Sequence, residues 1–257
     1  TYLLKDPDFF RVFLYNIFSY IQNMDNAIVI TAIERDGFVL KEYSTFCIES
    51  WKDWCTKKNI PLFIIEDDSF IHPKFAFLSI FERFNADKII HVDVDTIINP
   101  DTPDLFTLYD TKFTVVKDSG LIDYQISPRM SKGVDNFENI FTSFNLDKSK
   151  YFNSGMMMFH KNHKSFLNKS KIWIENNFDK IAKWSIDGGP GLDQTPFNWL
   201  VQKNNIETNF LDMKYNRTGV FKKKLNVNDN YILHFRGNKH GLKVHKMKKI
   251  FNELVGL

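Results

Sequence analysis

The chain has 257 residues, of which 43% are hydrophobic, and a formal net charge of +3. This composition can form a sizeable core, and we expect a single domain over residues 1–257. Basic and acidic residues are interspersed, which argues against a nucleic-acid-binding protein. No apolar run reaches the roughly 18 residues of a membrane span, and the two cysteines form neither a disulfide framework nor a zinc pattern. We expect a cytoplasmic protein, and the lysine-rich C-terminal third leaves peripheral contact with a membrane open.

The first half of the chain alternates between helix and strand patterns. Asp6-Pro7 and the apolar spacing that follows predict a helix within residues 1–25. Strands are expected at 27–32, 61–66 and within 89–96, separated by helices at 38–58 and 73–84. This β-α-β-α-β order predicts three parallel strands whose carboxyl ends share one edge of the sheet, the edge where ligands of open α/β sheets bind.

The second half is less regular. A strand is expected at 112–117, followed by a long loop over the site at 119–150. Further elements are a strand at 156–160, helices at 164–178 and 193–202, short strands at 206–211 and 231–235, and a final helix at 243–254. The fold class is therefore α/β, with a mostly parallel central sheet flanked by helices.

Asp93 and Asp95 follow the apolar strand that includes Ile89 and Ile90. Two carboxylates that converge at a strand end repel each other unless they are protonated or bridged by a hard cation such as Mg²⁺ or Mn²⁺. The Asp-x-Asp pattern alone is weak, because an acidic loop or a cap produces it as well. Support has to come from the rest of the chain.

Five stretches together resemble the GT-A type glycosyltransferases, in an order similar to that of the retaining family 8 enzymes, which include glycogenin and bacterial galactosyltransferases. The combination is far more specific than any one member. The stretches are Thr31-Ala32 with Arg35-Asp36-Gly37-Phe38, Ala86 to Thr96, Phe152-Asn153-Ser154-Gly155, Leu192-Asp193-Gln194 with Asn198, and His234-Phe235-Arg236-Gly237-Asn238-Lys239. The resemblance implies one GT-A (Rossmann-like) domain, with a nucleotide-binding half at 27–118 and an acceptor and sugar half at 119–257 that ends in a phosphate-binding segment.

The resemblance also implies roles for individual residues. Asp93, Asp95 and His234 would bind the metal ion, Mn²⁺ with Mg²⁺ as a substitute. Asp193 and Gln194 would lie at the reaction centre. The donor-binding residues would be Thr31, Ala32, Asp36, Phe38, Lys74, Asp93, Val94, Asn153, Ser154, Gly237 and Lys239. The chain departs from the family pattern at His240-Gly241, where Pro-Trp is usual, and at Phe38, where Tyr is usual.

Several of these residues also have an ordinary structural explanation. A lone histidine such as His234 is commonly a core or surface residue. Asn153-Ser154-Gly155 alone is compatible with a turn, and Asp193 with a helix cap. Only the combination favours a site.

The sequence thus predicts a metal-dependent glycosyltransferase that moves a hexose or related sugar from a nucleotide-sugar, expected to be a UDP-sugar, to a glycan, lipid-linked saccharide or protein, with retention. One alternative is a haloacid-dehalogenase-like phosphohydrolase with Asp93 as nucleophile, although Ile97 stands where those enzymes have Thr or Val. The other is a non-catalytic module that binds nucleotide-sugars or glycans.

Overall fold

The structure is a computed structural model and describes residues 24–34, 41–67, 69–108, 110–118, 127–189, 191–221, 226–237 and 240–256, without the side chains of Lys41, Arg129 and His240. The expected N-terminal helix falls almost entirely outside these residues. So do three predicted donor-binding residues, Asp36, Phe38 and Lys239. Predictions about them stay predictions.

The described elements alternate between strands and helices along most of the chain. The strands are β1 Met24–Thr31, β2 Leu62–Ile65, β3 Ala86–Asp93, β4 Thr96–Ile98, β5 Phe113–Lys117, β6 Phe152–His160, β7 Thr208–Leu211 and β8 Ile232–His234. The α-helices are α2 Lys41–Lys58, α3 Ile80–Arg83, α4 Pro128–Ile140, α5 Lys164–Ile186, α6 Gln194–Lys203 and α7 His240–Val255. The 3-10 helices are η1 Pro73–Ser79, η2 Leu105–Thr107, η3 Lys148–Lys150, η4 Lys161–His163, η5 Met213–Tyr215 and η6 Val227–Asp229.

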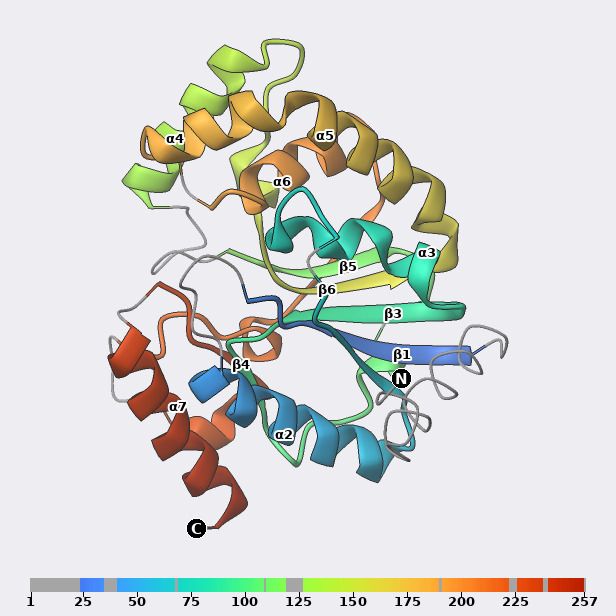
Figure 1. Cartoon of the computed structure of the whole chain (residues 1–257), viewed down its shortest axis with the longest axis vertical. Coiled ribbons are helices and arrows are strands. Elements are labelled where there is room, and N and C mark those ends of the chain that lie inside the picture. Colours follow the sequence, from blue (N-terminus) through green and yellow to red (C-terminus); the bar gives the residue numbers. More distant parts are fainter. Residues whose placement is uncertain are drawn as a thin grey trace, which may run out of the picture.

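Within the described residues, six strands form one central sheet in the order β2-β1-β3-β6-β5-β7. The pairs β1–β2, β1–β3 and β5–β7 are parallel, whereas β6 is antiparallel to both β3 and β5. Helices α4, α5 and α6 lie on one side of the sheet and α2 and α7 on the other (Figure 1). The predicted α/β class with a mostly parallel sheet is confirmed, and β6 is the exception in direction.

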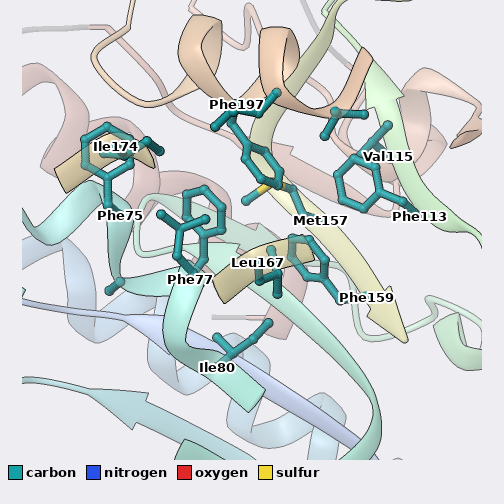
Figure 2. Close-up of a cluster of buried hydrophobic side chains, with 14 of the residues drawn as sticks. Phe75, Phe77, Ile80, Phe113, Val115, Met157, Phe159, Leu167, Ile174 and Phe197 are labelled. Atoms are coloured by element: carbon teal, nitrogen blue, oxygen red, sulfur yellow. The ribbon is translucent and has the colours of Figure 1, made fainter. Parts of the chain in front are cut away.

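Both faces of the sheet are buried, which explains why its strands read as continuous apolar runs. Alternate residues of a strand enter different cores: Ala27 and Val29 pack on the α5–α6 side, and Ile28 and Ile30 on the α2–α7 side. The first core is rich in phenylalanine, and Figure 2 shows Phe77, Phe113, Phe159 and Phe197 converging around Met157. Phe77 and Phe197 meet edge to face, with centroids 4.7 Å apart.

A second, two-stranded sheet joins the C-terminal part of the chain to the end of β3. β4 and β8 pair antiparallel, with Thr96 opposite His234. The amide of Phe235 donates to the carbonyl oxygen of Asp95 at 2.9 Å. Backbone pairing therefore brings His234 beside Asp93 and Asp95, although about 140 residues separate them in the sequence.

Several expected elements differ in the structure. Residues 128–140, expected within a long loop, form α4, which Pro128 opens and where the Ser127 side chain accepts a hydrogen bond from the amide of Met130. The helix expected at 73–84 is mostly the 3-10 helix η1. Strand β6 begins at Phe152 rather than 156, so Asn153-Ser154-Gly155 is a strand segment and not a turn. Within the described ranges, every helix is too short or too polar to cross a membrane.

Candidate active site

The two aspartates lie where β3 turns into β4. Asp93 is the last residue of β3, and Val94 and Asp95 form the turn. The Thr96 hydroxyl donates to the Asp93 carbonyl oxygen at 2.8 Å and accepts from the Trp51 indole at 3.0 Å. Because Trp51 is completely buried in α2, it fixes the turn against the core. The turn, rather than an extended strand, makes the two carboxylates neighbours.

His234 faces these carboxylates with one ring nitrogen. Its Nδ1 lies 3.1 Å from the side-chain oxygens of both Asn153 and Asn216. The Asn153 oxygen is identified as an acceptor, because the amide of Gly155 donates to it at 2.9 Å and the Asn216 amide group at 2.8 Å. Nδ1 must therefore carry a hydrogen, which leaves Nε2 pointing at the carboxylates.

The Nε2 atom lies 3.2 Å from Asp95 Oδ1 and 3.6 Å from Asp93 Oδ2. Burial alone would lower the pKa of His234, but the charge and hydrogen bond of Asp95, together with the charge of Asp93, outweigh it and raise this pKa. Burial would likewise raise the pKa of Asp95, but His234 and Lys243 hold it well below its ordinary value. Desolvation raises the pKa of Asp93, and repulsion by Asp95 adds to the increase. A cation between the three groups, either a proton or a metal ion, would relieve the repulsion between the two carboxylates.

One ligand atom from each of Asp93, Asp95 and His234 lies within 4.8 Å of the others. Two carboxylate oxygens and an imidazole nitrogen whose other nitrogen is hydrogen-bonded form a donor set typical of Mn²⁺ and Mg²⁺ sites. The residues therefore fit a divalent ion. The sequence prediction that the Asp-x-Asp pair and a distant histidine meet is correct in geometry.

Asp193 and Gln194 lie in a buried polar network beside this cluster. Asp193 stands at the start of α6, but its carboxylate accepts a hydrogen bond from the Ser154 hydroxyl at 2.6 Å rather than acting as a simple helix cap. The Gln194 oxygen accepts from Asn153 Nδ2 at 3.0 Å, and Gln194 Nε2 donates to Asp118 Oδ2 at 2.7 Å. Asn153 touches both His234 and Gln194, so it joins the Asp93, Asp95 and His234 cluster to the predicted reaction centre.

The remaining predicted donor residues lie around the same edge where the structure describes them. Thr31 ends β1 and its hydroxyl lies 3.0 Å from His91 Nε2, while Ala32 donates its amide to Ile65 at 2.8 Å. Lys74 is half-exposed, with its ammonium group 3.8 Å from Asp193. Gly237 has φ +78°, a conformation that favours glycine, and no atom of the described residues lies within 4 Å of an added Cβ. Val94, between the two aspartates, is partly buried.

The sequence did not single out four residues that contact this site. Asp118, after β5, has a fully buried side chain that accepts from Arg236 at 2.7 Å as well as from Gln194. Asn216 orients His234, and Lys243 in α7 donates to Asp95 Oδ2 at 2.7 Å. Arg236 lies inside the His-x-x-Gly motif and was detectable there. Asp118, Asn216 and Lys243 carry no local signal.

A mixed α/β sheet that ends in two aspartates, with a histidine from β8 facing them, is the arrangement that the sequence resemblance to GT-A glycosyltransferases led us to expect. The sequence profile of Glycosyl transferase family 8 matches residues 13–240, and the chain belongs to this family. The chain is therefore a glycosyltransferase, which argues against a phosphohydrolase and against a non-catalytic module. Enzymes of this family generally depend on a divalent metal ion and use a nucleotide-sugar donor. No curated protein matches the chain in sequence.

Solved structures of glycosyltransferases share the fold at low sequence identity. An enzyme involved in the glycosylation of the major capsid of PBCV-1 is 10% identical, with a TM-score of 0.54, over 87% of this chain and 99% of that chain. GlyE of Streptococcus pneumoniae TIGR4 in its apo form is 14% identical, with a TM-score of 0.52, over 91% of this chain and 64% of that chain. Mouse xyloside xylosyltransferase 1 is 12% identical, with a TM-score of 0.50, over 83% of this chain and 98% of that chain. Such identities establish the fold alone.

Proposed function

We propose that the chain transfers a hexose or related sugar from a UDP-sugar to a glycan, lipid-linked saccharide or protein acceptor, with retention and with Mn²⁺ or Mg²⁺ as cofactor. The observation that carries the proposal is the orientation of His234. Its Nδ1 is committed to two asparagine oxygens, and its Nε2 faces Asp93 and Asp95 at 3.6 and 3.2 Å. A divalent ion between these three side chains would satisfy both carboxylates and the free ring nitrogen.

Asp93, Asp95 and His234 would hold the ion, which supplies Lewis-acid stabilisation to the diphosphate leaving group when bound. The chain itself supplies the walls of the site. Gly237 gives the backbone after His234 a left-handed conformation, and Lys239 in the same segment would add a positive charge for the phosphates. Thr31, Ala32, Asp36, Phe38 and Val94 would line the nucleoside side of the pocket.

Asp193, Gln194, Asn153 and Ser154 would bind the transferred sugar. Asp193 accepts from Ser154 through Oδ2, so its Oδ1, 3.8 Å from Lys74, is available to sugar hydroxyls. The Gln194 amide is held at both ends, by Asp118 and by Asn153. A glutamine amide is a weak nucleophile, and this one is hydrogen-bonded at both ends. A same-face displacement assisted by the leaving phosphate therefore explains retention better than a covalent intermediate on Gln194.

The test is a thermal-shift screen of nucleotide-sugars with and without Mn²⁺, because a ligand that binds the folded state alone raises the melting temperature. We expect a UDP-sugar to raise it only in the presence of the ion. The same UDP-sugar should then be hydrolysed slowly or transferred. Equal shifts with and without Mn²⁺ would contradict the metal centre.

Two substitutions test the ligands directly. Asp95→Ala and His234→Ala should each abolish metal-dependent turnover while the protein stays folded, because each removes one of three protein ligands. Lys248→Met, an exposed change on α7, serves as the control and should retain activity. Near-wild-type activity in either ligand variant would count against the site.

A further inference from the structure

Lys243 is the cation that contacts the proposed metal site from the C-terminal helix. It belongs to the first turn of α7, and its side chain is 12% exposed. Its ammonium group lies 2.7 Å from Asp95 Oδ2 and 4.9 Å from the centre of the Tyr43 ring. A positive charge in the first turn opposes the helix dipole, so this placement costs stability unless a nearby anion compensates it. Asp95 is that anion.

The Asp95 carboxylate is shared between two partners. Oδ1 lies toward His234 and Oδ2 binds Lys243. The ammonium group is therefore one carboxylate away from the position that a metal ion would take between Asp93, Asp95 and His234. The ammonium group and a metal ion on opposite sides of one carboxylate would repel each other strongly in a partly buried site.

The charges of the described residues around the cluster indicate a role for Lys243. Asp118 and Asp193 have cations of their own in Arg236 and Lys74. Asp93 and Asp95 contribute two negative charges and Lys243 one positive charge. A divalent ion would therefore leave an excess positive charge, which a bound diphosphate would remove.

We propose that Lys243 is the resident counter-ion of the metal site and makes the site accept a divalent ion together with a diphosphate rather than alone. The inference rests on the proposed function. When the diphosphate is present, the flexible lysine side chain has a second anion within the same site to which it donates. Without Lys243, two carboxylates balance a divalent ion by themselves, and the ion binds without nucleotide.

The experiment titrates Mn²⁺ alone into purified protein and follows free Mn²⁺ by electron paramagnetic resonance. Lys243→Met, which keeps the length of the side chain and removes its charge, should bind Mn²⁺ at least tenfold more tightly than wild type. That factor is the lower end of what one nearby like charge produces. In a second titration with UDP present, the enhancement of Mn²⁺ affinity by UDP should be smaller in the variant by the same factor.

Lys243→Arg keeps the charge and should bind Mn²⁺ within about twofold of wild type. Lys248→Met removes an exposed lysine from the same helix, where solvent and salt screen its charge, and should also leave the affinity unchanged. Lys243→Gln replaces Lys243→Met if the latter does not fold. Circular dichroism and melting temperature establish folding in each case.

The outcomes separate the inference from the proposed function. Unchanged or weaker Mn²⁺ binding by folded Lys243→Met, with measurable binding by wild type, would overturn the inference alone, because Lys243 would then only position Asp95. Absence of Mn²⁺ binding by wild type with UDP present would overturn the metal centre and the inference with it.

Discussion

Replacement of Gly155 by alanine should displace the histidine of the proposed metal centre. Gly155 lies in β6, directly against the ring of His234. A Cβ at this position would stand 2.1 Å from His234 Cε1 and 2.4 Å from Nδ1. Ordinary contact begins at 3.4 Å, so the ring would have to move by about 1.3 Å. The His234 side chain is 3% exposed and has little room to move.

The magnitude follows from the tolerance of metal coordination. Metal–ligand distances hold within about 0.2 Å, several times less than this displacement. The movement would also break the contacts of Nδ1 with Asn153 and Asn216. Loss of such supporting contacts typically lowers metal affinity by about 10–100-fold, and we expect at least this loss for Gly155→Ala. Overpacking should cost about 1–3 kcal/mol of stability in addition.

A Mn²⁺ titration in the presence of UDP measures the loss of metal affinity, and a urea unfolding curve measures the loss of stability. The matched control is Gly241→Ala in the first turn of α7, where no atom in the described part of the chain lies within 4 Å of the added Cβ. This control should bind Mn²⁺ like wild type and gain up to about 1 kcal/mol of stability, because alanine favours the helix. Folded Gly155→Ala with wild-type Mn²⁺ affinity would refute the assignment of His234 as a ligand.

Two further predictions concern charge and protonation. Burial, with His160 beside it, lowers the pKa of His163 to about 4, and its Nδ1 accepts from the His160 amide. The free energy of unfolding should therefore be unaffected by His163 above its unfolded pKa of about 6.5 and should fall as the pH drops toward 4, by about 2 kcal/mol at pH 5. His163→Asn keeps a hydrogen-bond acceptor and should remove this part of the loss. Urea titrations at pH 7.5 and 5 measure the difference. Arg236→Met leaves the buried Asp118 carboxylate without its cation and should cost about 3 kcal/mol. Arg236→Met combined with Asp118→Asn should recover most of this loss, and equal losses in both variants would contradict the ion pair.

Local patterns in the sequence determined much of the α/β scaffold. Strands buried on both faces read as apolar runs, and turns and caps separate them from helices, so β1, β2 and β3 and their parallel order could be predicted. The same reading failed for α4. The helix has charged and polar residues on much of its surface and begins from Ser127 and Pro128, a start signal that the weak periodicity obscured.

The strand-end pattern pointed to Asp93 and Asp95, and the family resemblance added His234, because residue types at fixed spacing carry that signal. It could not supply Asp118, Asn216 or Lys243. These residues act through partners 118, 18 and 148 positions away, in the pairs Asp118–Arg236, Asn216–His234 and Lys243–Asp95. A polar residue that forms a hydrogen bond or ion pair with a buried, sequence-distant partner cannot be told from a surface residue by sequence alone.

The sequence by itself determined which strands are buried, where two carboxylates emerge and which histidine accompanies them. Only the tertiary structure decided that Asn153 and Asn216 fix the His234 ring, that Gly155 leaves space for it and that Lys243 neutralises Asp95. The reason is that hydrophobic burial is recorded residue by residue along the chain. Which charged and hydrogen-bonding side chains become neighbours depends instead on how α6, α7 and β8 pack against the sheet, and this packing brings together segments that are distant in the sequence.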